Sequence, residues 1–147
     1  MTAKNVGRRK IVSVIGNRKI EKDGIRYKIA FELGKALVDN GYRVQSGGLR
    51  GVMEAVLAGA RSSEHYHEGD TIALVPSFDT ETANEYADIV IPTGLDVMRN
   101  ALVANAYAVI GVGGGAGIWR FMMMKPISSS TVISLVYPSG TSVSSTV

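Results

Sequence analysis

Cysteine is absent from the 147 residues, which excludes disulfide bridges and thiolate chemistry. A chain without disulfides suits a reducing compartment, so we expect the protein in the cytoplasm. Long hydrophobic runs are absent as well. None approaches the roughly 18 residues of a membrane-spanning helix, and we expect no membrane partner. The basic start at residues 1–9 is followed by an apolar stretch too short for a signal peptide. We interpret residues 1–9 as a solvated basic leader.

Acidic residues are missing from the C-terminal third. All 13 carboxylates lie at or before Asp96, so a mechanism that needs an acid from that third is excluded. The formal net charge of +3 is small and argues against a nucleic-acid partner. Hydrophobic residues at 46% and charged residues at 20% are typical of a globular protein, and the length suits one domain.

Apolar runs that end at glycine alternate with segments of helical periodicity. The runs predict strands and the periodic segments predict helices. Strands are expected at 10–16, 42–48, 71–76, 88–94, 107–115 (with its glycine loop) and 131–137, and helices at 23–40, 51–60 and 96–106. We expect Asp23 to cap the first helix and Gly41 to end it.

The strands lack the alternation of apolar and polar residues that a half-exposed sheet requires. Together with the helices between them, this pattern predicts an α/β fold. We expect a doubly wound, mostly parallel, Rossmann-like sheet in a single domain at residues 10–137. The last residues, 138–147, are rich in serine and threonine, and we expect them to form a flexible tail.

Glycines follow three of the predicted strands. Because the carboxyl ends of parallel strands share one edge of the sheet, these turns are expected to meet at a common cleft. Glycine allows the backbone to approach a phosphate, and the next helix offers free amides. The phosphate-binding candidates are Gly16, Asn17, Gly47, Gly48, Gly51, Gly113, Gly114, Gly115 and Gly117. The structural alternative is that each glycine only shapes a tight corner between a strand and a helix.

Arg99 is the charged residue most suited to this cleft. It lies just after the fourth predicted strand, where a guanidinium can hold a phosphate through two donors. Asn100 beside it can bind a ribose or a base edge. The alternative for Arg99 is an ion pair with Asp96, one turn earlier. Glu54 faces either a ligand or a partner, or forms a surface salt bridge.

The segment 64–70 places two histidines among three carboxylates. No metal-ligand spacing recurs elsewhere, so we interpret this segment as a solvated loop and expect no metal site.

Four segments in order, "SVIGNR", "SGGLRGVMEAVLAGA", "TIALVP" and "TGLDVMRNALVANAYAVIGVGGGAG", resemble a Rossmann-like superfamily once misnamed lysine decarboxylases. This superfamily includes the Lonely guy phosphoribohydrolases and the molybdenum-cofactor carrier proteins. The likeness is greatest to the carrier proteins and their uncharacterised relatives, and it covers about residues 10–117. It implies a doubly wound fold, a homodimer or higher homo-oligomer, and a phosphorylated, nucleotide-like ligand at the glycine edge.

The resemblance breaks after Gly117. Phosphoribohydrolases carry a Pro-Gly-Gly-x-Gly-Thr-x-x-Glu loop, whose glycines match Gly114, Gly115 and Gly117, whereas Gly113 replaces the proline. Ile118 replaces the threonine, and Phe121 replaces the catalytic glutamate. Arg99 matches the catalytic arginine of that family. True divergence and a shifted reading frame both account for the break.

Three functions follow from these observations. The first is a binding protein for a phosphorylated nucleotide or a molybdopterin-type ligand, because Phe121 cannot do the work of the missing acid. The second is a nucleoside 5'-monophosphate phosphoribohydrolase, in which Arg99 is catalytic with an unidentified acid. The third is a structural or interaction remnant without a ligand. No resident cofactor is assigned beyond a bound nucleotide or molybdenum cofactor.

Overall fold

The computed structural model describes residues 8–113, 131–135 and 143–146, and side chains are described within 8–113. Seven strands form one sheet in the order β4-β3-β2-β1-β5-β6-β7. Every pair from β4 to β6 is parallel, and β7 runs antiparallel to β6. The strands are β1 (Ile11–Gly16), β2 (Arg43–Ser46), β3 (Thr71–Val75), β4 (Ile89–Pro92), β5 (Ala108–Val112), β6 (Thr131–Leu135) and β7 (Val143–Thr146). The predicted α/β class with a mostly parallel sheet is confirmed.

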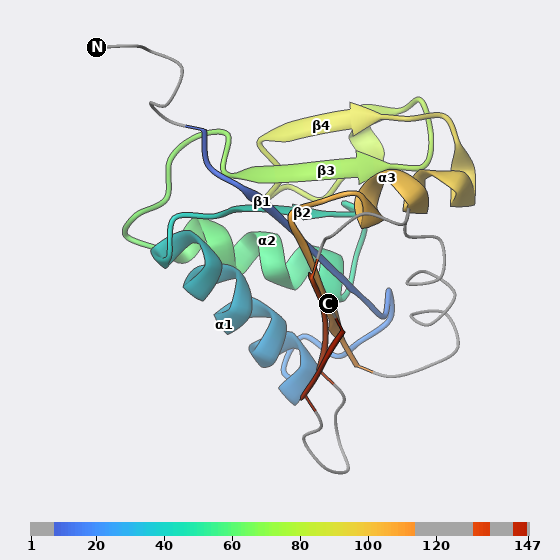
Figure 1. The fold of residues 1–147 in the computed structure, drawn as a ribbon. Coiled ribbons are helices and arrows are strands. Elements are labelled where there is room, and N and C mark those ends of the chain that lie inside the picture. The colour runs from blue at the N-terminus through green and yellow to red at the C-terminus, as the bar shows by residue number, and fades with distance from the viewer. Residues whose placement is uncertain (1–7, 114–130, 136–142, 147) are drawn as a thin grey trace.

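Helices cover both faces of the sheet. The helices α1 (Ile25–Asp39) and α2 (Val52–Ser62) lie together on one face, as Figure 1 shows. Successive side chains of a strand point to opposite faces. Val14 of β1 accordingly joins the core under α1 and α2, whereas Ile15 joins a second cluster with Val103 and Ala104 of α3 (Asn100–Ala104). Two clusters on opposite faces make the sheet doubly wound.

The helices α1 and α2 approach each other at two glycines. A methyl group on Gly34 would meet the carbonyl oxygen of Val56, and one on Gly59 would meet the carbonyl oxygen of Phe31. Each helix therefore gives up a side chain where the backbone of the other passes. All residues from Val52 to Ala60 are buried, so α2 is the central helix of this layer.

Helix ends differ partly from the sequence prediction. Gly24, without a side-chain cap, begins α1, so Asp23 is not its cap. Gly41 has a φ of +84° and donates to Val38, as expected of a left-handed stop. The predicted helix at 96–106 is instead a 3-10 turn, η3 (Asp96–Arg99), followed by α3. Asp96 has a φ of +50°, which is incompatible with the start of an α-helix.

Both sheet edges also differ from expectation. The strand β4 was expected to be covered, but it pairs with β3 alone and is largely exposed, with Ile91 43% accessible. Residues 138–147 were expected to form a flexible tail, yet β7 lies within them and pairs with β6.

The basic leader is tied to the fold at its end. Arg9 makes a two-point ion pair with Asp70, which is completely buried, and Arg43 approaches the same carboxylate at 3.9 Å. The interpretation of Arg9 as solvated is therefore wrong, and so is that of Asp70 as part of a solvated loop. Within the described ranges, no helix is long and apolar enough to cross a membrane.

Candidate functional site

The carboxyl ends of the parallel strands lie at one edge of the sheet. Gly16 at the end of β1 is in register with Val112 at the end of β5, and Ser46 at the end of β2 is in register with Ala73 of β3. In Figure 1 the arrowheads of β3 and β4 point toward α3 at this edge. The predicted meeting of the glycine turns at one edge agrees with this topology.

A network of short turns places Arg99 at this edge. The Thr93 hydroxyl donates to the carbonyl of Val75 at 2.8 Å, and the Asp96 amide donates to the carbonyl of Pro76 at 3.0 Å. The positive φ of Gly94 and Asp96 turns the chain back over the end of β3. η3 begins at this point, so Arg99 on its last position lies over the ends of β2 and β3.

The guanidinium of Arg99 is buried against glycine. Arg99 is only 8% exposed, and a methyl group on Gly47 would lie 2.5 Å from its Nη1 and 2.7 Å from its Nη2. The sulfur of Met53 borders the same space. Gly47 therefore leaves room for a cation at the end of β2, and a larger residue at position 47 would displace the Arg99 guanidinium.

Arg99 has more donors than partners. Its Nη1 donates to the side-chain oxygen of Asn100 at 2.9 Å, while its Nε is buried without a partner among residues 8–113. No ion pair within residues 8–113 joins Arg99 to Asp96, so that alternative is not what the structure contains. Burial lowers the pKa of Arg99, and the Asp96 carboxylate offsets part of that shift. A desolvated cation with a free donor is an anion-binding group.

A cavity of about 240 Å³ opens beside this guanidinium. We call it the Arg99 cavity. It is lined by Arg18, Leu49, Met53, Pro76, Asp96, Val97, Arg99 and Asn100. Two cations, one carboxylate and an amide share it with apolar walls, and a few polar groups on apolar walls are the usual composition of a small-molecule site. Of the predicted residues, Arg99 and Asn100 line this cavity.

Several predicted glycines have packing roles instead. A methyl group on Gly16 would lie 2.6 Å from a methyl of Val52, and one on Gly48 would lie 2.5 Å from Cβ of Ala73. Gly51, with a φ of +70°, faces the backbone of Asn17 and Arg18. Gly16 therefore permits the close approach of α2 to the end of β1, and Gly48 permits that of the loop after β2 to β3.

Internal hydrogen bonds occupy part of the expected amide cradle. The Gly48 amide donates to the Ser46 hydroxyl at 3.1 Å, and the Val52 amide donates to the carbonyl of Asn17 at 3.0 Å. Asn84 fixes the other side of the loop through the carbonyls of Gly48 and Leu49. Hydrogen bonds within the protein therefore hold this loop, and the positive charge of the site comes from its arginine side chains, Arg18 and Arg99.

A second cavity has a volume of about 300 Å³. We call it the Glu54 cavity. It is lined by Arg18, Ile20, Lys22, Tyr27, Arg50, Gly51 and Glu54. Glu54 forms the salt bridge considered for it, with the exposed Lys22, but its own carboxylate is buried, because Glu54 is only 7% exposed. Arg18 lines both cavities.

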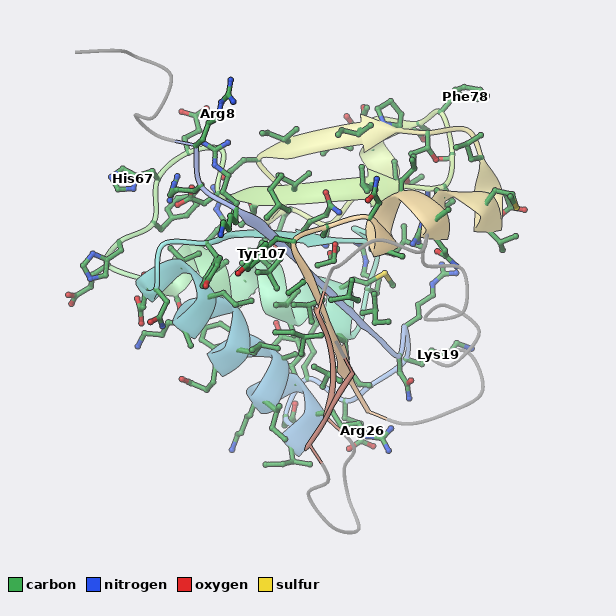
Figure 2. All side chains as sticks on the ribbon, viewed as in Figure 1. Arg8, Lys19, Arg26, His67, Phe78 and Tyr107 are labelled. Carbon is green, nitrogen blue, oxygen red and sulfur yellow. The ribbon has the colours of Figure 1, made fainter. Side chains whose placement is uncertain are left out.

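The histidine-containing segment lies away from this edge. Figure 2 shows His67 near the start of β3, at the opposite end of the strand from Phe78. Among the described residues, no three metal-ligating side chains come together.

Sequence reasoning missed Arg18, Arg50 and Asn84. Arg18 and Arg50 come directly after glycine stops, in "IGNR" and "GGLRG", and this spacing was a usable signal. Asn84 is far from the loop in sequence and gave none. Gly113 has a φ of +92° and borders Asn17. The candidates Gly114, Gly115 and Gly117, and the substitutions at Ile118 and Phe121, lie outside the described residues.

Comparisons with known proteins agree with this architecture. The sequence model of the SLOG cluster4 family matches residues 9–145, which extends beyond Gly117. An uncharacterized protein of Archaeoglobus fulgidus is 35% identical over 107 residues, which span 72% of this chain and 66% of that protein, just under two thirds of its length.

Two solved structures are similar in fold and sequence. The molybdenum cofactor binding protein of the phototrophic bacterium Rippkaea orientalis superposes with a TM-score of 0.78 at 29% identity, over 90% of this chain and 79% of that one. The molybdenum cofactor carrier protein of Chlamydomonas reinhardtii superposes with a TM-score of 0.74 at 26% identity, over 88% and 79%. The resemblance drawn from the sequence is confirmed.

Proposed function

The chain belongs to the SLOG cluster4 family, and from this premise we propose that it binds a phosphorylated small molecule in the Arg99 cavity. The ligand is a nucleotide or a molybdopterin-type compound, and its phosphate pairs with Arg99. One observation carries the proposal: Arg99 is only 8% exposed, and its Nε has no hydrogen-bond partner among residues 8–113 beside an open cavity. The names of the two structural neighbours support a carrier role.

The chemistry of the cavity favours an anion. Burying a cation without a counter-charge is costly, and in this chain no carboxylate from residues 8–113 pairs with Arg99. A phosphate supplies both the missing charge and acceptors for the free donor. Arg18 and Asn100 add donors on the same wall. Gly16, Gly47, Gly48 and Gly51 hold this wall in place, and Asn17 with Gly113 to Gly115 and Gly117 completes the proposed edge.

Calorimetric titration tests the proposal. GMP, AMP and inorganic pyrophosphate are titrated into the protein and into Arg99→Gln, which keeps a polar side chain without the charge. Losing charged hydrogen bonds of about 1.5–3 kcal/mol weakens binding by roughly tenfold to a hundredfold. Arg26→Gln on α1, remote from the Arg99 cavity, is the matched control and retains wild-type affinity. Equal affinities in all three proteins would refute the assignment.

The same samples separate the other functions. Free base released from GMP or AMP, and abolished by Arg99→Gln, would establish a phosphoribohydrolase instead. Absence of saturable binding would favour the remnant without a ligand.

We also propose a cytoplasmic homo-oligomer, a dimer or higher. Val97 and Met98 of η3 are 64% and 59% exposed and offer an apolar contact surface for it. Native mass spectrometry measures the subunit number and any ligand carried through purification.

A further inference from the structure

Glu54 is a buried acceptor that the protein itself barely uses. Its carboxylate makes no hydrogen bond to any residue from 8 to 113, and its ion pair is with Lys22, at 3.5 Å between Nζ and Oε1. The Lys22 side chain is 71% exposed, and an exposed partner at that distance contributes little. A carboxylate offers about four lone-pair positions, and those of Glu54 lie in the lining of the Glu54 cavity. A ligand in that cavity can supply donors to them.

The rest of the Glu54 cavity suits a flat ring. Ile20 and Tyr27 contribute apolar surface, while Arg18 and Arg50 contribute charge. Burial, and after it the nearby Glu54 carboxylate, raises the pKa of Tyr27. The phenol therefore stays neutral, and its ring can pack on another ring. A volume of about 300 Å³ is sufficient for a bicyclic heterocycle.

A carboxylate recognises a specific ring edge. Two parallel N–H donors, as on the face of a guanidinium, bind both oxygens of one carboxylate. The ring N–H and the neighbouring exocyclic amine of guanine form the same pair of donors, and pterin carries that edge too. Adenine presents an acceptor in place of the ring N–H, and an acceptor facing a buried carboxylate is left without a partner.

We propose that the Glu54 cavity binds the ring of the ligand through the amino-pyrimidinone edge that guanine and pterin share. This inference rests on the proposed function, because the phosphate of the same ligand lies in the Arg99 cavity. Arg18 lines both cavities and spans the two ends of the ligand. Glu54 then selects the ring, and Arg99 supplies affinity for the charge.

A series of three nucleotides tests the selection. GMP, IMP and AMP are titrated calorimetrically into the wild-type protein. IMP keeps the ring N–H but lacks the exocyclic amine, so it binds about tenfold more weakly than GMP, and AMP binds about a hundredfold more weakly. Neopterin monophosphate in the same series separates the two sources of this edge: tighter binding than GMP assigns the cavity to pterin, and weaker binding assigns it to guanine.

Glu54→Gln gives the sharper result. An amide offers one donor and one acceptor, which is the pattern that adenine matches. The variant therefore loses the preference for GMP and binds AMP at least as tightly as GMP. Glu32→Gln is the matched control: it replaces an exposed carboxylate of α1, outside both cavities, by an amide and retains the preference. If Glu54 serves only to hold Lys22, Lys22→Gln changes binding in the same way as Glu54→Gln, and the inference is wrong.

Failure of this inference is distinct from failure of the proposed function. Equal affinities for GMP, IMP and AMP, all lost in Arg99→Gln, would overturn the ring assignment and leave the phosphate site standing. Absence of binding by all three would overturn both. Because the nucleotide series uses the unmodified protein, it decides the question even if Glu54→Gln does not fold.

Discussion

Replacing Arg99 by methionine should stabilise the empty protein and weaken its response to ligand. Methionine keeps the unbranched stem and removes the guanidinium, whose Nη1 and Nη2 lie beside Gly47 and Met53. It removes a buried Nε that lacks a partner, a defect that costs about 1–3 kcal/mol. It also removes the hydrogen bond from Nη1 to Asn100. Asn100 is only partly buried, so water replaces that bond at a cost near 0.5–1 kcal/mol.

The balance is a gain of about 1 kcal/mol in the free energy of unfolding, or about 3 °C in the melting temperature of a domain of this size. Ligand reverses the order. At a ligand concentration near 100 times its Kd, the wild-type protein gains about 2.7 kcal/mol, whereas Arg99→Met, which binds about tenfold to a hundredfold more weakly, gains only about 0.4–1.4 kcal/mol. Melting curves with and without GMP measure both effects. Arg99→Met should have the higher melting temperature without ligand, and the wild-type protein should have the higher one with GMP.

The reverse result would refute this reasoning. If Arg99→Met loses about 2 kcal/mol or more without ligand and gains as much stability from GMP as the wild-type protein, then Arg99 is a structural residue whose donors are satisfied in solution. A Lys28→Met control on α1 removes a cation from an exposed position. It should leave both the melting temperature and the ligand response close to wild type, since exposed substitutions stay within about 0.5 kcal/mol.

Three further substitutions test the fold around the site. Gly59→Ala should destabilise by about 3 kcal/mol in urea, because its methyl group meets the carbonyl oxygen of Phe31; a loss under about 1 kcal/mol would mean that the helices separate easily. Tyr66 donates to Asp88 at 2.6 and 2.7 Å, and Tyr66→Phe should cost about 1.5 kcal/mol at pH 7. Burial and then this hydrogen bond raise the pKa of Tyr66 above 10.0, so its contribution is complete below about pH 10 and is lost as the pH rises through the raised value. The wild-type advantage should shrink there, and a difference constant from pH 7 to 11 would contradict the linkage. Asp70→Asn should cost about 3 kcal/mol, because it removes the buried carboxylate that pairs with the partly buried Arg9 and Arg43; denaturant titration would contradict this with a loss near zero.

Local patterns in the sequence predicted most of the sheet because buried strands are a local property. The run before Gly16 and the run at 71–76 became β1 and β3 within a residue or two. The stop at Gly41 was also predictable, since a positive φ at the end of a helix favours glycine. Position within the sheet was not predictable in this way, so the exposure of β4 at the edge was missed.

The site was less accessible to such patterns. Helical periodicity joined 96–106 into one helix, but contacts of Asp96 with the end of β3 impose a turn there. Glycine spacing suggested a cradle of amides, whereas Ser46 and Asn17 occupy amides of Gly48 and Val52 through tertiary contacts.

Glu54 carried a signal that went unused. The apolar residues around it leave α2 with no polar face, and a helix that is hydrophobic all round is buried. A carboxylate in such a helix must itself be buried, and a buried carboxylate needs hydrogen-bond donors.

The most direct test of the central claim is the Nε–H resonance of Arg99 in the NMR spectrum of isotope-labelled protein, followed during titration with GMP. We predict a saturable shift of this resonance with the same Kd as calorimetry, because the phosphate accepts from a donor that is unpartnered in the empty protein. The Nε–H resonance of Arg26 on α1 should not move. Saturable binding of GMP that leaves the Arg99 resonance unchanged would contradict the account.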